Sequence, residues 1–418
     1  MSTTPDILLH WQEIVGKEMA VLSKPVATVL ALWSFGIMSV KSCGRQSVAG
    51  FLALLLNTKA AAVEQRLYEW CVERKHKSGS KRVDWDVRRC FGPLLGWIVR
   101  LWRSEQMALV LDATSLGDRF TVLTISVVYR SMGLPVAWKI LRSTEKHAWR
   151  AEWQALIRSI WRVIPRHWQV IVLADRGLYA DWLFRRIARV GWHPFMRVNG
   201  NGCFVPTDGR PTRQEHPFES GPLRGQRVPN RRYLSHLLSQ PGDHYAGTGI
   251  AFSGKRALPC TVLATWDAAH KDPWIVITDL QPQDCNVAWY ALRGWCEQGF
   301  KCVKRGGWQW QLTRMDDPTR AERLWLALAL AMLWCVAIGS ALEDDPEIHA
   351  LFEGWLPNPT DLTISKPARP TRPTRLIRLF RLGLIYIIAA AFLHRPWPVP
   401  TALIPSPWPI ALPSALPP

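Results

Sequence analysis

The sequence predicts an α/β protein in which a mixed-sheet core follows a helical domain and is interrupted by a β-rich insertion. Three observations support this prediction. Apolar residues recur at helical spacing through residues 1–100. Residues 107–198 then show strand-like and helix-like patterns in the order β-β-β-α-β-α-β. Residues 199–285 turn to Gly, Pro and Arg with short strand-like runs between them. At 418 residues the chain can hold two or three structural units.

The N-terminal region, residues 1–104, is expected to be a helical DNA-binding region. Helical spacing covers residues 26–40, 48–56 and 63–72, and polar turns separate these runs. Short helices joined in this way fit a helix-turn-helix DNA reader and a generic helical bundle equally well. The basic stretch KHKSGSKR, residues 75–82, is suited to contacts with phosphate.

Residues 105–198 are expected to form the first part of the mixed-sheet core. The runs 107–115, 120–129 and 134–141 predict three consecutive strands. After them, strand-like runs close near residue 175 and at 193–198, and helical patterns cover 147–163 and 182–190.

Two of these apolar runs close on a carboxylate, Asp112 and Asp175. Open α/β sheets bind ligands beyond their strand ends, although a single such Asp is often only a turn or helix-capping residue.

Residues 199–285 are expected to form a β-strand-rich insertion domain. Its strand-like runs are 249–252, 261–265 and 274–278. Its arginines would suit a DNA backbone, or they are a solvent-facing decoration. These arginines are Arg210, Arg213, Arg224, Arg227, Arg231 and Arg232.

The core resumes at residues 286–345, where the stretch YALRGWCEQGFKCVK carries four residues able to act together. On one α-helix, Tyr290, Arg293, Glu297 and Lys304 would lie within roughly 60° of one another. One carboxylate flanked by cations is half of a metal–phosphate site. The alternative is a solvated helix face with an Arg–Glu pair four residues apart, worth only a few tenths of a kcal/mol.

The charge of the chain points to a polyanionic partner. It has 52 Lys and Arg against 33 Asp and Glu, a formal net charge of +19. The 24 Trp exceed what a core needs, so some are expected to stack on bases while most are core. The nine Cys are an odd number without a CxxC pair, which favours a reducing cytoplasm over a disulfide framework or a zinc ribbon.

One stretch satisfies the length of a membrane span. Residues 324–342 are 19 residues without a charge. A fully buried central helix gives the same pattern, and we expect that instead. The N-terminus lacks the features of a signal peptide. Residues 346–418 are expected to be a basic, Pro-rich tail, because Arg recurs every third residue in 369–381. The last 25 residues contain nine Pro and no acidic residue, so we expect them to be disordered.

Asp112, Asp175 and Glu297 therefore come from two strand ends and one helix. Three carboxylates from separate elements, surrounded by basic residues, are what a pair of Mg²⁺ ions requires. We expect two Mg²⁺ ions, with Mn²⁺ as a substitute. Neither His-rich nor Cys-rich spacing offers a competing metal site.

With these motifs the chain resembles the DDE transposases of the insertion-sequence-4 type. The motifs are LVLDAT at Asp112, LADRGL at Asp175, and the spacing Tyr-(2)-Arg-(3)-Glu-(6)-Lys from Tyr290 to Lys304. The resemblance covers about residues 105–342. It implies a ribonuclease H-like core interrupted by a β-strand insertion.

The resemblance also implies roles for single residues. Asp112, Asp175 and Glu297 would be catalytic and hold the metals, and Tyr290, Arg293 and Lys304 would bind DNA phosphates. Trp274 would stabilise a flipped base at a hairpin-forming transposon end, and Arg197 is counted among the DNA-binding residues. The partners would be double-stranded DNA, both terminal inverted repeats and target, and a second copy of the chain in a homodimeric synaptic complex. Membrane attachment is not expected, and the location would be the bacterial cytoplasm, at the nucleoid.

Three alternatives remain at this point. A ribonuclease H-like nuclease or resolvase would keep the three carboxylates without joining strands, although the Tyr, Arg and Lys of the signature argue against it. An inactive transposase copy would have the same sequence features. A membrane-associated basic protein would use residues 324–342 and 376–393 as spans and leave the carboxylates unexplained.

Overall fold

The computed structural model describes residues 6–78, 84–145, 149–207, 232–268, 271–352, 377–393, 395 and 397–412. Several residues that the sequence singled out lie outside this part of the chain. They are five insertion arginines (Arg210, Arg213, Arg224, Arg227 and Arg231), residues 79–82 of the KHKSGSKR stretch, and the arginines of 369–375.

The helices and strands follow the predicted order closely. The helices are α1 (Asp6–Glu18), α2 (Lys24–Val40), α3 (Arg45–Leu55), α4 (Ala60–Cys71), α5 (Phe91–Leu101), α6 (Arg150–Ile160), α7 (Asp181–Arg189), α8 (Trp295–Val303), α9 (Pro318–Glu343), α10 (Pro346–Leu351) and α11 (Leu379–Phe392). The strands are β1 (Gln106–Leu116), β2 (Phe120–Tyr129), β3 (Met132–Arg142), β4 (Gln169–Ala174), β5 (His193–Arg197), β6 (Cys203–Pro206), β7 (Arg232–Tyr233), β8 (His244–Ala251), β9 (Leu258–Thr265) and β10 (Trp274–Thr278).

Within the described residues the strands form one ten-stranded mixed sheet, in the order β3-β2-β1-β4-β5-β10-β9-β8-β6-β7. The first three strands are antiparallel neighbours, and β1, β4 and β5 run parallel. This half of the sheet has the ribonuclease H-like arrangement that the resemblance implies. The chain has the predicted α/β class.

The insertion strands continue the core sheet, whereas the sequence suggested a module beside it. Strand β10 pairs antiparallel with β5 through Val276 and Arg197, and β9 and β8 follow in the same sheet. An open β5 edge would expose unpaired backbone groups, and β10 covers that edge. The division of the chain into five segments stays a prediction.

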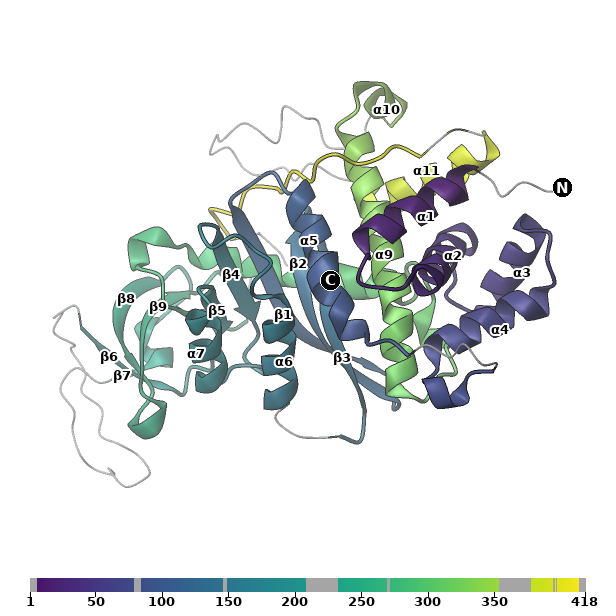
Figure 1. The fold of residues 1–418 in the computed structure, drawn as a ribbon. Helices are drawn as coiled ribbons and strands as arrows, with labels where there is room; N and C mark the ends of the chain where they lie inside the picture. The colour runs from purple at the N-terminus through teal and green to yellow at the C-terminus, as the bar shows by residue number, and fades with distance from the viewer. Residues whose placement is uncertain are drawn as a thin grey trace.

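Helix α9 is the centre of the molecule. It lies between the sheet and the N-terminal helices, with α5, α6 and α7 in front of the sheet (Figure 1). It is the one helix of the described chain that is long and apolar enough to cross a membrane, and 94% of its apolar window is buried within the protein. Ion pairs hold both of its ends against the β2–β3 hairpin: Lys139 of β3 pairs with Glu322 at 2.8 Å, and Arg130 of the turn pairs with Glu343 at 2.9 Å.

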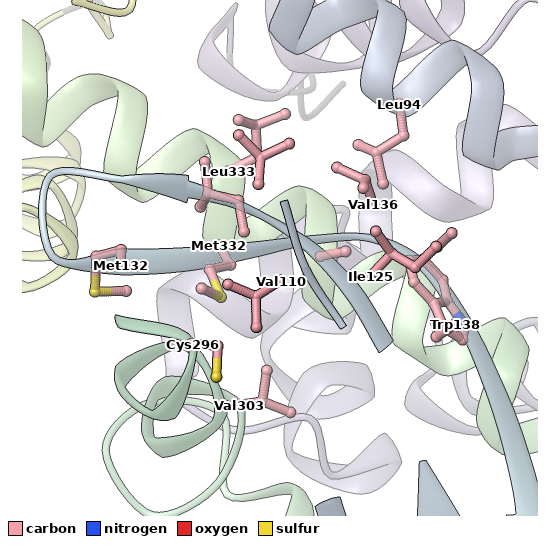
Figure 2. Close-up of a cluster of buried hydrophobic side chains, with 14 of the residues drawn as sticks. Leu94, Val110, Ile125, Met132, Val136, Trp138, Cys296, Val303, Met332 and Leu333 are labelled. Atoms are coloured by element: carbon pink, nitrogen blue, oxygen red, sulfur yellow. The ribbon is translucent and has the colours of Figure 1, made fainter. Parts of the chain in front are cut away.

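The core that supports the site is built from both sides of the sheet. Side chains from α5, β1, β2, β3, α8 and α9 converge in one apolar cluster (Figure 2). Many of the tryptophans belong to this core, including Trp138, Trp308, Trp310 and Trp325, each 0–1% exposed. These rings cannot stack on bases in this structure.

The Pro-rich C-terminal segment is ordered over residues 397–412, although its composition predicted disorder. It crosses one end of the sheet (Figure 1), where Leu403 pairs with Trp102 and is fully buried. Arg130 Nε donates to the Ile404 carbonyl at 2.8 Å, and Trp408 packs edge-on against Trp289 at 4.7 Å. Proline is compatible with this packing, because an extended segment makes no internal backbone hydrogen bonds that the missing proline N–H would break.

Candidate active site

Asp112 and Asp175 are neighbours on adjacent strands. The parallel register of β1 and β4 ends with the pair Leu111 and Ala174, so the two aspartates are the next residues on each strand. Asp175 follows β4, as predicted. Asp112 lies inside β1, which continues to Leu116, whereas the sequence placed it at a strand end. The extension arises because β1 and β2 form a hairpin that carries β1 past the end of β4.

The alternation of side chains along β1 aims Asp112 at α8. Residues two apart on a strand share one face, so Val110, Asp112 and Thr114 point the same way. Figure 2 shows Val110 directed toward α8, where Cys296 and Val303 lie. Asp112 therefore faces the segment that carries the Tyr-Arg-Glu-Lys spacing.

That segment is not one α-helix, which corrects the sequence interpretation. Residues Val287–Gly294 form a 3₁₀ helix (η6), and α8 begins at Trp295 and ends before Lys304. The side chain of Asn286 accepts from the Ala288 amide at 2.8 Å and caps the tighter turn. A 3₁₀ helix has three residues per turn, so Tyr290 and Arg293 still share one face.

Two glycines seat α8 directly on β3. A Cβ atom on Gly133 would lie 2.7 Å from Cys296 Cα, and one on Gly299 would lie 2.2 Å from the Gly133 carbonyl oxygen. Any larger side chain at either position would push α8 off the sheet. The close approach fixes α8 over the sheet, with the Cys296 thiol in contact with Asp112 on β1.

Arg293 bridges all three carboxylates. Its Nη2 donates to Asp112 Oδ1 at 3.2 Å and to Asp175 Oδ2 at 3.4 Å, and its Nη1 donates to Glu297 Oε1 at 3.2 Å. Burial lowers the pKa of Arg293, but the neighbouring Asp112 and Asp175 more than offset it, so the pKa lies above its ordinary value. The three carboxylates, 63 and 122 residues apart in the chain, thus meet at one guanidinium.

The other two signature residues lie on either side of this cluster. Lys304 Nζ donates to Thr114 Oγ1 and to the Ser115 carbonyl, each at 2.8 Å, and burial lowers its pKa. Tyr290 is 5% exposed, and burial raises the pKa of its phenol to about 12. Tyr290 is therefore neutral at physiological pH.

Trp274 and Arg197 do not present free faces to a ligand. Trp274 is 3% exposed on β10, and its ring lies edge-on to Tyr290 with 5.2 Å between the ring centres. In this conformation it is a core residue, which the sequence alone did not separate from a base-stacking role. Arg197 donates to the Pro273 carbonyl at 3.2 Å, and burial lowers its pKa.

Sequence reasoning missed two polar residues beside Asp112. The Cys296 thiol donates to Asp112 Oδ2 at 2.8 Å; burial first, and then the Asp112 charge, raise its pKa far above the usual range, so it stays protonated. Thr124 faces Asp112 across the β1–β2 pair and is fully buried. Its hydroxyl has no hydrogen-bond partner among the described residues. Two features of the sequence could have pointed to these residues: Cys296 is next to Glu297, and Thr124 is a polar residue within an apolar strand.

The donor set suits a divalent metal by its chemistry. Three carboxylates at one point are the hard oxygen ligands that Mg²⁺ prefers, and the Thr124 hydroxyl is a further oxygen without a partner. Across the described part of the chain, however, no three His, Cys, Asp or Glu side chains are arranged around a common ion position. Arg293 stands where the charges converge, so a metal would have to displace it.

Comparison with known proteins agrees with this geometry. A family model described as the transposase DDE domain matches residues 106–334. One similar solved structure is the cryo-EM structure of a piggyBac transposase synaptic complex with hairpin DNA, with a TM-score of 0.33, 11% identity, and coverage of 89% of this chain and 86% of that chain. That likeness is too low to transfer residue roles. A search of curated proteins finds no match. The family match covers more than half of the 418 residues, from β1 into α9, and includes all three bridged carboxylates, so the chain belongs to the transposase DDE domain family.

Proposed function

We propose that this protein is a DNA transposase of the insertion-sequence-4 type that moves its element by cut-and-paste phosphoryl transfer. The observation that carries the proposal is the meeting of Asp112, Asp175 and Glu297 at Arg293. Family membership supplies the reaction class. The net charge of +19 supports double-stranded DNA as the partner.

In this proposal Asp112, Asp175 and Glu297 would hold two Mg²⁺ ions. The bound ions would supply the chemistry of a two-metal site, activation of a water or 3′-hydroxyl and stabilisation of the leaving oxygen. Mn²⁺ would substitute, since it also accepts oxygen ligands. The Cys296 thiol, donating to Asp112, would orient that carboxylate.

Arg293 has two alternative partners in this scheme. Without metal it neutralises the carboxylates, and once they bind cations it is released to donate to a DNA phosphate. Lys304, held at the Thr114 end of β1, would contact a second phosphate. Tyr290 would contact a further phosphate, and Arg197 would contribute to DNA binding. Trp274 would stack on a flipped base, which requires movement from its buried position. A hairpin intermediate and a homodimeric synapse belong to the proposal through the family resemblance.

The test is cleavage of a duplex carrying the DNA that flanks the gene. Asp112→Asn, Asp175→Asn and Glu297→Gln should each abolish Mg²⁺-dependent cleavage while leaving duplex binding in place, because each removes one metal-binding charge without changing side-chain size. A wild-type protein that cuts but never joins ends to target DNA would favour the nuclease alternative. A wild-type protein that binds ends without cutting would identify an inactive copy.

A further inference from the structure

An arginine-lined groove lies between α6 and α7, away from the three carboxylates. It encloses a cavity of about 340 Å³. Its lining includes Gln154, Asp181 and Trp182, and five arginines, Arg150, Arg158, Arg185, Arg186 and Arg189.

The sequence places these arginines together through helical spacing. On α6, Arg150 and Arg158 are eight residues apart, and on α7 Arg185 and Arg189 are four apart, so each pair shares one helix face. The apolar faces of both helices are buried, with Trp153 and Ile157 on α6 and Leu183 on α7. The two basic faces are therefore left side by side on the outside of the helical layer.

The charge of this groove is not compensated within the protein. None of the five arginines takes part in an ion pair among the described residues, and Asp181 is the one acidic side chain in the lining. The Arg186 Nε is buried and lacks a hydrogen-bond partner within the described chain. Crowding like charges is unfavourable, so this arrangement fits an anion that binds between the helices.

Two of the arginines are already held in place. Arg185 Nη2 donates to the Ala257 carbonyl at 2.7 Å, and the Arg150 guanidinium lies over the Trp182 ring at 5.3 Å. Side chains fixed before binding lose less entropy when the ligand arrives. The groove is therefore partly preorganised for a ligand, whereas mobile cations on a solvated surface would lose more entropy on binding.

We propose that this groove binds the sugar–phosphate backbone of a double-stranded DNA segment outside the catalytic site, without reading its sequence. This proposal rests on the proposed transposase function, and it gives the protein a second DNA-binding surface. Arg150 and Arg158 are separated by about 12 Å along the helix axis, about three base-pair steps, which suits a backbone better than a single small anion. Guanidinium–phosphate contacts position DNA but carry no sequence information.

The test compares two double variants that each lose two exposed cations. Arg158→Gln with Arg189→Gln removes charge from the groove, and Arg166→Gln with Arg395→Gln removes the same charge elsewhere. Binding of two unrelated duplexes is measured by fluorescence anisotropy over a range of salt concentrations, without metal. The groove variant should bind both duplexes more weakly and shallow the salt slope by about two units, since each phosphate contact contributes about 0.9. The control variant should keep the wild-type slope.

The outcomes separate this proposal from the proposed function. If the wild type cleaves its flanking DNA but the groove variant binds like the wild type, or no more weakly than the control variant, the groove proposal is wrong and the transposase proposal stands. If inorganic phosphate binds the wild type and not the groove variant, while duplex binding is equal, the groove is a small-anion site and the proposal is also overturned. If the wild type neither binds nor cleaves duplex DNA, the transposase proposal fails first. Thermal melting of each variant confirms that the compared proteins are folded.

Discussion

At the scale of single residues, Arg293 is the cation that balances the charge of the three carboxylates. It contacts three carboxylates at 3.2–3.4 Å, and its own Nε is buried without a partner in the described structure. An arginine cannot lose its proton under ordinary conditions. Its position is therefore in direct competition with any cation that the carboxylates bind.

Replacing Arg293 by Gln should strengthen Mg²⁺ binding while weakening cleavage. Removal of the guanidinium leaves three carboxylates without a counter-ion, so the metal-free state rises in free energy. We expect Mg²⁺ affinity in calorimetry to increase by about tenfold, which corresponds to about 1.4 kcal/mol. Cleavage should fall, because a phosphate contact is lost.

Arg197→Gln is the matched control, since Arg197 donates to a backbone carbonyl and to none of the three carboxylates. Its Mg²⁺ affinity should stay close to that of the wild type. A lower Mg²⁺ affinity in Arg293→Gln would show that Arg293 organises the carboxylates and does not compete for them.

The sequence was a good guide to which residues gather and a poor guide to how they touch. The spacing from Tyr290 to Lys304 and the two apolar runs closed by Asp112 and Asp175 predicted the cluster. Burial of Trp274 and the thiol bond from Cys296 to Asp112 depend on tertiary packing, which no local pattern encodes.

At the scale of elements, the contact of α8 with β3 positions the site. Gly299→Ala should destabilise the protein, since its Cβ atom would meet the Gly133 carbonyl oxygen at 2.2 Å. Overpacking of this kind costs typically about 1–3 kcal/mol. We expect a lower unfolding midpoint in urea and reduced cleavage, because Glu297 lies on α8 and moves with it.

Gly50→Ala provides the control for this substitution. Gly50 is also within a helix, and a Cβ atom there would meet nothing within 4 Å. Alanine should therefore stabilise the protein by about 0.5–1 kcal/mol through helix propensity. Equal effects of the two substitutions would mean that α8 is free to shift away from β3 at little cost.

Most elements were predictable because their hydrophobic periods are strong. The sequence located β2 and β10 at their observed bounds, and the apolar residues 324–342 fall within α9. The signature helix was wrong in type over Val287–Gly294 and right over Trp295–Val303, since a 3₁₀ turn and an α-turn share similar apolar spacing over eight residues. Helix α11 falls within the apolar residues 376–393, which the sequence offered as a span of the membrane alternative, whereas the packing of residues 397–412 was hidden by a Pro-rich composition.

At the scale of the whole molecule, buried thiols predict a loss of stability in alkali. Burial raises the pKa of five cysteines from 9.0 to about 12, namely Cys43, Cys71, Cys90, Cys260 and Cys302. The unfolded chain releases these protons first as the pH rises. Their contribution to stability is thus complete below pH 9 and is lost as the pH rises toward 12.

Urea unfolding with a reducing agent present should show this trend. The free energy of unfolding should be steady up to about pH 9 and then fall, by at most about 1.4 kcal/mol per pH unit for each such cysteine. Cys302→Ala, compared at each pH with its own value at pH 8, should show a shallower decline. An unfolding free energy that stays constant from pH 8 to pH 11 would contradict the buried, protonated state of these thiols.

The continuous sheet was the feature of the whole molecule that the sequence did not predict. Strands of the insertion have ordinary β patterns, and nothing in them specifies that β10 pairs with β5. Long-range pairing is fixed only when the two edges meet in the folded chain.

The most direct test of the central claim is the metal dependence of Asp175→Cys. The claim is that Asp112, Asp175 and Glu297 bind the metal ions that cut DNA. A thiolate is a poor ligand for Mg²⁺ and a better one for softer Mn²⁺. Cleavage of the flanking duplex by Asp175→Cys should therefore be lost in Mg²⁺ and partly recovered in Mn²⁺, with Asp175→Ala inactive in both. Robust cleavage by either variant in Mg²⁺ would contradict the claim.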